Sequence, residues 1–156
     1  MENVKRKYET FRNKYSLPKF SDLIKEFNVN SENPDLILHD IVDKINDRVM
    51  SHAKIIESII FVGTGETASN LFEAKMLRNR RKSIFELYKE LMSIKWKGIK
   101  IETRADEKEM ANFIKDTHEK WIKKLKIEFV NICEEFEKRW KDASLGTSST
   151  ETMYLG

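Results

Sequence analysis

The chain has 156 residues, of which 35% are charged and 40% hydrophobic, and it contains only five glycines and two prolines. This length suits one domain with a substantial buried core, and the scarcity of turn residues excludes a turn-rich β-sandwich. The formal net charge of +3 is too small by itself to predict a nucleic-acid-binding protein. We therefore expect a single all-α domain over residues 1–143.

The N-terminal segment predicts two short helices. Residues 2–15 place apolar side chains on one face of a helix, and Pro18 ends it because proline lacks an N–H and disfavours helix in the preceding residue. Ser21 and Asp22 are suitable caps for a second helix, from about Asp22 to Phe27.

Three long helices are expected to follow, over about 34–61, 68–97 and 105–142. Asn33-Pro34-Asp35 predicts the first start, with an Asx cap, a proline in the first turn and an early acid. The third helix would be a rod of about 57 Å, at roughly 1.5 Å per residue. Its apolar side chains step by three or four residues without a slip: Met110, Phe113, Thr117, Trp121, Leu125, Phe129, Ile132, Phe136 and Trp140. We expect an elongated antiparallel three-helix bundle with the short N-terminal segment packed on it.

The sequence also predicts the connections between these helices. Gly63-Thr64-Gly65 is typical of a helix-ending turn, and the next helix should begin near Thr67 or Ser69. Ile99 to Thr103 alternates like a strand, but it has no partner strand, so we expect an extended linker. Residues 144–156 are small and polar and are expected to form a flexible tail.

The basic run Arg78-Asn79-Arg80-Arg81-Lys82 lies within the second long segment. Apolar residues at helical spacing flank it, so the helix is expected to pass straight through it. Leu77 and Ile84 are seven residues apart, which places Arg80 or Arg81 near the seam between them. A charge beside a core stripe needs a carboxylate partner, either in this chain or on another molecule.

The distribution of charge suggests where that partner lies. Residues 73–100 carry nine basic and three acidic side chains, whereas residues 30–61 carry three basic and six acidic ones. Opposite signs on consecutive helices favour packing of the two side by side. One interpretation is that the arginines pair with Asp43, Asp47 or Glu57, and that Trp96 is part of the core.

The alternative interpretation is a surface for a protein or a nucleic acid. Its cations would be Lys75, Arg78, Arg80, Arg81, Lys82 and Lys89, with Lys95, Trp96 and Lys97 adding a stacking surface. Both interpretations stay open at the level of sequence, and the candidate surface residues are Arg78, Arg80, Arg81, Lys82, Lys89 and Trp96.

Other chemistries find weaker support. The segment Gly63–Ser69 lacks the Gly-Lys-Ser/Thr ending of a nucleotide-binding loop. Acids at Asp40, Asp43 and Asp47 resemble one half of a helical Mg²⁺ site, but a solvated face or a counter-face for the basic helix explains them as well. The histidines fit no metal-ligand spacing: His39, His52 and His118. We expect no catalytic, cofactor-binding or metal-ligating residues.

The single cysteine, Cys133, cannot form a disulfide within the chain, and its apolar neighbours in sequence predict a buried, reduced thiol. No signal peptide or membrane-spanning run is evident. A reducing, cytoplasmic location is therefore expected.

One family resemblance starts at the basic run. Leu77 to Arg81, the apolar helix Ile84 to Ile94, and Glu109-Met110-Ala111-Asn112-Phe113 follow the same order as in one class of helical subunit of the GINS replication complex. The chain resembles these subunits over residues 72–122. The resemblance implies a structural subunit of a multi-protein helicase assembly, in which Arg78, Arg80 and Arg81 hold helix to helix or subunit to subunit.

The function predicted from the sequence is a non-enzymatic helical interaction or scaffolding protein that binds a protein partner or a second copy of itself. A nucleic-acid-binding accessory protein that uses the basic helix 75–97 is the alternative. A helical metal-dependent hydrolase is a third and weaker hypothesis.

Overall fold

The computed structural model describes residues 2–61 and 67–143, and every regular element in these ranges is helical. The elements in chain order are α1 (Glu2–Tyr15), α2 (Phe20–Phe27), a 3₁₀ turn η1 (Pro34–Leu36), α3 (Ile37–Ile60), α4 (Ala68–Met76), a 3₁₀ turn η2 (Arg78–Arg80), α5 (Arg81–Arg104), α6 (Glu107–Lys120), a π-helical turn η3 (Trp121–Leu125) and α7 (Lys126–Asp142). The expected all-α fold is confirmed. The predicted turn at Gly63–Gly65 and the tail 144–156 lie outside the described residues.

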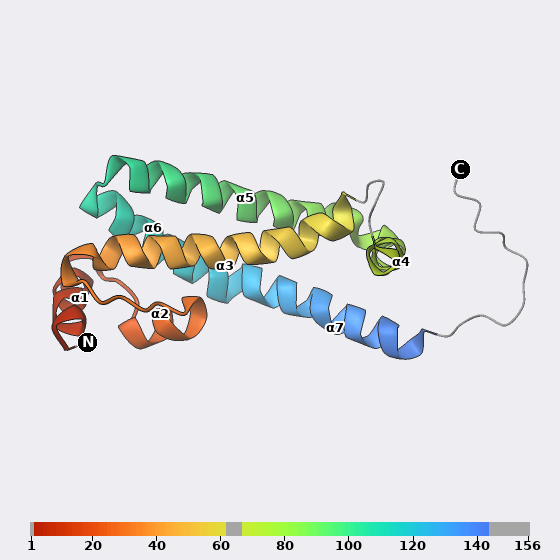
Figure 1. Ribbon diagram of the computed structural model, residues 1–156, viewed down its shortest axis with the longest axis horizontal. Coiled ribbons are helices and arrows are strands. Elements are labelled where there is room, and N and C mark those ends of the chain that lie inside the picture. Colours follow the sequence, from red (N-terminus) through yellow and green to blue (C-terminus); the bar gives the residue numbers. More distant parts are fainter. Residues whose placement is uncertain (1, 62–66, 144–156) are drawn as a thin grey trace, which may run out of the picture.

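Three long helical segments form the elongated body of the molecule (Figure 1). α3 and α5 lie side by side and run in opposite directions, and α6, η3 and α7 form the third segment, which runs parallel to α3. α1 and α2 pack at the end where α3 begins and α6 lies. None of the described helices is long and apolar enough to span a membrane.

The N-terminal helices form as expected, with one correction. α1 buries Val4 and Tyr8, and the Tyr8 hydroxyl donates a hydrogen bond of 2.7 Å to the carbonyl of Pro18. α2 begins at Phe20, so Ser21 and Asp22 lie inside the helix and do not cap it. The earlier start buries Phe20 against Tyr8, with ring centroids 4.9 Å apart, and that packing outweighs the polar cap.

The predicted start of the first long helix is confirmed. Asn33 Oδ1 accepts a hydrogen bond of 3.0 Å from the Asp35 N–H, Pro34 opens the 3₁₀ turn, and α3 continues from it.

The second long segment differs from the prediction of one helix over 68–97. α4 begins after Thr67, which caps it, and ends at Met76, so the helix does not pass straight through the basic run. The break buries Leu77, at 2% exposure, while α4 lies across the gap between the diverging ends of α3 and α7 (Figure 1).

α5 is also longer than expected. It continues through Gly98 to Arg104, so residues 99–103 are helical and not an extended linker. Ile101 is 3% exposed, and this burial holds the last turns of the helix against the bundle. Ala105 then adopts a left-handed conformation, with φ 52°, and Asp106 caps α6.

The third long segment contains a π turn that corrects the prediction of a regular helix. Each four-residue step from Phe113 through Trp121 to Phe129 would rotate a regular α-helix by roughly 40°, and four such steps by roughly 160°. A continuous α-helix would therefore carry Phe129 to the side opposite Phe113. The π turn at Trp121–Leu125 rotates less per residue than an α-helix does and so reduces this drift, and Trp121, Leu125 and the later Ile132 all reach the core.

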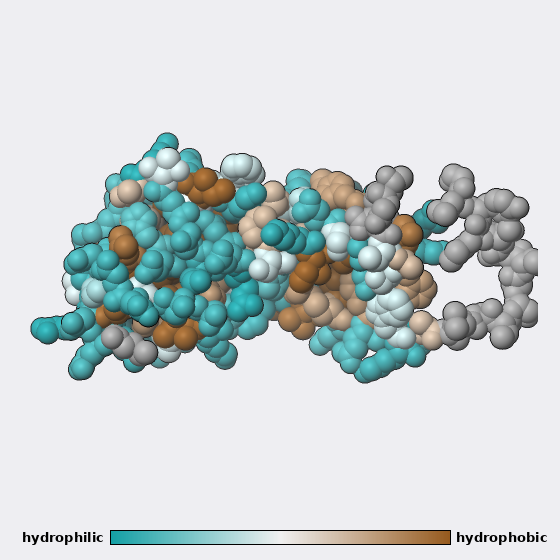
Figure 2. Space-filling view, in the orientation of Figure 1, coloured by the Kyte–Doolittle hydropathy of each residue, from teal (hydrophilic) through white to brown (hydrophobic). Residues whose placement is uncertain are grey.

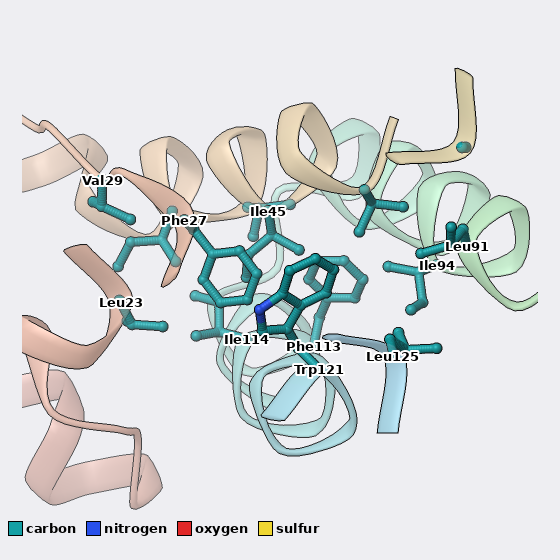
Figure 3. Packing of buried hydrophobic residues seen from close by; sticks show 14 of the residues in the cluster. Leu23, Phe27, Val29, Ile45, Leu91, Ile94, Phe113, Ile114, Trp121 and Leu125 are labelled. Atoms are coloured by element: carbon teal, nitrogen blue, oxygen red, sulfur yellow. The ribbon is translucent and has the colours of Figure 1, made fainter. Parts of the chain in front are cut away.

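Trp121 fills the space between α2, α3 and α6. Figure 3 shows its ring between Phe27 and Phe113, and the Phe27 and Trp121 centroids are 5.7 Å apart. Its indole Nε1 donates a hydrogen bond of 3.1 Å to the carboxylate of Glu26, a residue only 9% exposed. Lys126 Nζ lies 2.9 and 2.8 Å from the two oxygens of the same carboxylate.

The Glu26 carboxylate thus joins α2 to both sides of the π turn. Burial alone would raise the pKa of Glu26, but the hydrogen bonds from Lys126 and Trp121 outweigh it, and the net pKa is lowered.

We predict that Glu26→Ala lowers the free energy of unfolding by about 3 kcal/mol, because it leaves the buried indole N–H unpaired and removes a charged hydrogen bond. Glu26→Gln keeps an acceptor for Trp121 and should lower it by only about 1 kcal/mol. Urea unfolding followed by circular dichroism measures both variants. Equal losses would show that the hydrogen bond to Trp121 contributes little.

Packing weakens along α7. Of the described residues of α7, Ile132 is the one that is buried, whereas Ile127, Val130 and Trp140 are 52%, 43% and 43% exposed. In Figure 2 apolar residues gather over the C-terminal part of α3 and the neighbouring α7, while the half that holds α1 and α2 is mostly hydrophilic. The two ends of the bundle therefore differ in how completely their apolar side chains are covered.

Candidate interaction surface

The basic run forms the corner between α4 and α5. The Arg80 guanidinium donates a hydrogen bond of 2.6 Å to Glu135 Oε2 of α7, and Arg81 Nη2 donates one of 3.0 Å to the carbonyl of Ile60 at the end of α3. Arg78 and Lys82 are exposed and have no ion-pair or hydrogen-bond partner within residues 2–61 and 67–143.

The expected pairing of the arginines with Asp43, Asp47 or Glu57 is therefore wrong. The helix break at Leu77 directs Arg80 toward α7, whose Glu135 is 55 residues away in sequence. The hydrogen bond from Arg80 lowers the pKa of Glu135, against the opposing effect of burial, and Arg139 adds to the lowering.

We predict that Arg80→Ala lowers the free energy of unfolding by about 1 kcal/mol, equivalent to a melting temperature about 2–4 °C lower, because it removes a half-buried ion pair between η2 and α7. Arg78→Ala and Lys82→Ala are matched controls, since each removes an exposed cation whose side chain has no partner among the described residues. Differential scanning calorimetry on the three variants checks this. If Arg80→Ala melted at the same temperature as the two control variants, the ion pair of Arg80 would not stabilise the fold.

The outer face of α5 carries a second apolar stripe. Its core side holds Ile84, Leu87, Leu91, Ile94, Gly98 and Ile101. The side of the helix that faces away from the core carries what we call the outer stripe: Phe85, Trp96 and Ile99. Phe85, Trp96 and Ile99 are 38%, 61% and 38% exposed, so the interpretation of Trp96 as a core residue is wrong. A helix with apolar stripes on two opposite sides is typical of one that is covered on both.

Cations flank the outer stripe. Lys82, Lys89 and Lys100 are exposed, and Lys95 Nζ lies 4.8 Å from the centre of the Trp96 ring. Among these, Lys89 pairs with Glu86 of the same helix at 2.9 Å.

The other acids of α5 are turned inward. Glu90 pairs with Lys120 and Lys124 of the third helical segment, and Glu102 faces α3. Internal pairing of Glu90 and inward placement of Glu102 therefore leave the outer face of α5 with a net positive charge.

Aromatic side chains extend the outer stripe toward the end of α3. Phe61 is 51% exposed, and its ring centroid lies 6.2 Å from Phe85 and 5.6 Å from Tyr88. The exposed apolar surface thus reaches the corner that holds Arg81.

The interface between α3 and α5 differs from the simple charge pairing that the sequence suggested. The two helices do pack side by side, but acids from both meet there. Burial raises the pKa of Glu102 to about 7, aided by a hydrogen bond with Asp43 and by the charges of Asp43 and Asp47, while a hydrogen bond from Asn46 opposes the rise. Asn46 also fills the space beside Gly98, where an added Cβ would lie 2.3 Å from its Oδ1.

We predict that Glu102→Gln stabilises the protein above pH 7 by about 1 kcal/mol, less than the whole pKa shift would give because the carboxyl is partly exposed. The folded protein holds this proton up to about pH 7, whereas an unfolded chain releases it near pH 4.5. Stability of the parent protein should therefore fall as the pH rises between these values. Melting temperatures of the parent protein and of Glu102→Gln at pH 4, 6 and 8 test this. A difference in melting temperature between the two that does not grow with pH would contradict it.

No three side chains of the metal-ligating kinds His, Cys, Asp and Glu come together as a possible metal site in the described part of the chain. His52 and His118 are half-buried, and burial lowers the pKa of each. The prediction of a buried Cys133 is wrong, since the π turn sets Ile132 toward the core and leaves Cys133 exposed.

The structure divides the six predicted surface residues into two groups. Lys82, Lys89 and Trp96 lie along the outer face of α5, and the three arginines lie at the corner where that helix begins. Sequence reasoning missed Phe85 and Ile99 as parts of the surface. Their signal was present, because Phe85, Trp96 and Ile99 are spaced by eleven and three residues, about three turns and one turn of a helix.

Comparisons with known proteins gave no match to this chain, whether it was compared with models of protein families, with curated proteins or with solved structures.

Proposed function

We propose that the protein is a non-enzymatic α-helical interaction protein that binds an acidic partner protein through the outer face of α5. The observation that carries the proposal is the outer stripe, which leaves Trp96 61% exposed on the side of α5 opposite its core face. Large aromatic side chains on a surface are typical anchors of protein interfaces.

The charges beside the stripe indicate the chemistry of the partner. Lys82, Lys95 and Lys100 have no acidic partner in an ion pair within the described ranges. Acidic side chains on a partner would pair with these cations at the rim of the contact and would speed its association.

The shape of the stripe favours a helix as the binding element. Phe85 and Ile99 are fourteen residues apart, so the stripe covers about 21 Å of helix at roughly 1.5 Å per residue. An amphipathic helix with apolar residues every three or four positions and acids beside them would match it.

The resemblance to GINS subunits stays a prediction. It is compatible with this proposal, because it also implies a structural subunit of a larger assembly. What supports it is that Arg80 and Arg81 each join the start of α5 to another helix.

We predict that Lys100→Glu and Trp96→Ser each abolish retention of the acidic partner, because one reverses a rim charge that has no acidic partner among the described residues and the other removes the apolar anchor. The measurement is affinity purification from the native cell on immobilised parent and variant proteins, with quantitative mass spectrometry. The partner should elute as salt rises, as charge pairing requires.

Lys115→Glu on α6 is the matched control, since it makes the same charge change at an exposed position off the surface. Circular dichroism should show all variants folded. A partner that both surface variants retain, or that the control loses equally, would contradict the proposal.

A second candidate function is binding of single-stranded nucleic acid, favoured by the exposed Trp96 ring beneath Lys95. Ile99→Ser separates the two candidates, because an aliphatic side chain contributes to helix packing but offers no ring for a base to stack on. Fluorescence anisotropy with a labelled oligonucleotide over a range of salt provides the readout. Affinity that falls steeply with salt and survives Ile99→Ser would favour nucleic acid over a partner helix.

A further inference from the structure

A pocket lies at the junction of α3, α4 and α5, at the end of the molecule away from α1 and α2. Its volume is about 330 Å³, at the small end of the usual range for small-molecule sites. Apolar side chains form its floor: Ile59, Ala74, Leu77 and Ile84. Leu77 and Ile84 are 2% and 1% exposed, so the floor is part of the core.

The charged side chains that line this pocket are all cations. Lys75, Arg78 and Arg81 contribute to the wall, and no described lining residue is acidic. Arg81 uses one N–H on the carbonyl of Ile60, which fixes its position and leaves further N–H donors of the guanidinium group free. Arg78 and Lys75 have no ion-pair or hydrogen-bond partner in the part of the chain that the structure describes.

The apolar floor and the cationic wall distinguish this pocket from the outer stripe. The outer stripe is a convex helix face, whereas this pocket is a concave, largely apolar space whose wall includes three cationic residues. Such a combination suits a molecule with one anionic head and one short apolar tail, because the tail displaces water from the floor while the head pairs with arginine.

We propose that this pocket binds a small amphiphilic anion, with its carboxylate or comparable head on Arg78 and Arg81 and its apolar tail over Leu77 and Ile84. The site is separate from the outer stripe, so it adds a ligand to the proposed interaction function and does not depend on it.

Decanoate, used below its micellar concentration, is the probe, and isothermal titration calorimetry is the measurement. The parent protein should bind one decanoate per chain saturably. Arg78→Ala should weaken binding about tenfold, as expected for the loss of one charged hydrogen bond. Lys82→Ala is the matched control, because it removes a neighbouring exposed cation that does not line the pocket, and it should change the affinity less than twofold.

Two further comparisons separate head from tail. Decanol, which has the same tail without the charge, should bind at least tenfold more weakly, and acetate, which has the head without the tail, should show no saturable binding. Ala74→Trp fills the pocket without removing a cation and should abolish decanoate binding. Lys100→Glu and Trp96→Ser, which alter the outer face of α5, should leave decanoate binding unchanged.

Equal affinity for decanol and decanoate would overturn the proposal, as would equal effects of Arg78→Ala and Lys82→Ala. Saturable binding that persists in a folded Ala74→Trp variant would also overturn it. Because Arg78 is exposed and its side chain has no partner within residues 2–61 and 67–143, its variant keeps the proposal testable even if Ala74→Trp does not fold.

Discussion

The bundle depends on the placement of Trp121, which requires one turn of the third helical segment to be π-helical. Four successive four-residue steps in the apolar pattern cannot stay on one side of a regular α-helix. The π turn resolves this conflict, and the buried Glu26 carboxylate holds both the Trp121 indole and Lys126. Before this turn, α6 packs fully against α3, whereas α7 after it buries only Ile132 of its described residues. The well-packed end and the incompletely covered end follow from this one irregularity.

The charged side chains of α5 are divided between its inner and its outer face. Glu90 of α5 is paired with lysines of the third segment, and Glu102 lies against the acids of α3. The lysines of α5 that face away from the bundle therefore lie beside exposed aromatic side chains with little acid to balance them. These exposed apolar and cationic side chains are the ones on which the proposed binding face rests.

Local features were predictable from the sequence, and long-range ones were not. The cap at Asn33 and the opening of α6 after Ala105 involve neighbouring residues, so sequence alone located them. The partner of Arg80 lies 55 residues away, and no pattern identifies it. The end of α5 was misplaced because alternation over residues 99–103 resembles a strand, while burial of Ile101 keeps the segment helical.

The break at Leu77 explains why one basic run has several roles. If the helix were continuous there, all the cations would lie along one rod, and the tertiary contacts of Arg80 and Arg81 would not form as they do. Because the chain turns, Arg80 reaches α7, Arg81 reaches the end of α3, and Arg78 is left at the wall of a pocket. The turn thus uses two arginines to close the corner and leaves the side chains of Arg78 and Lys82 without partners among the described residues.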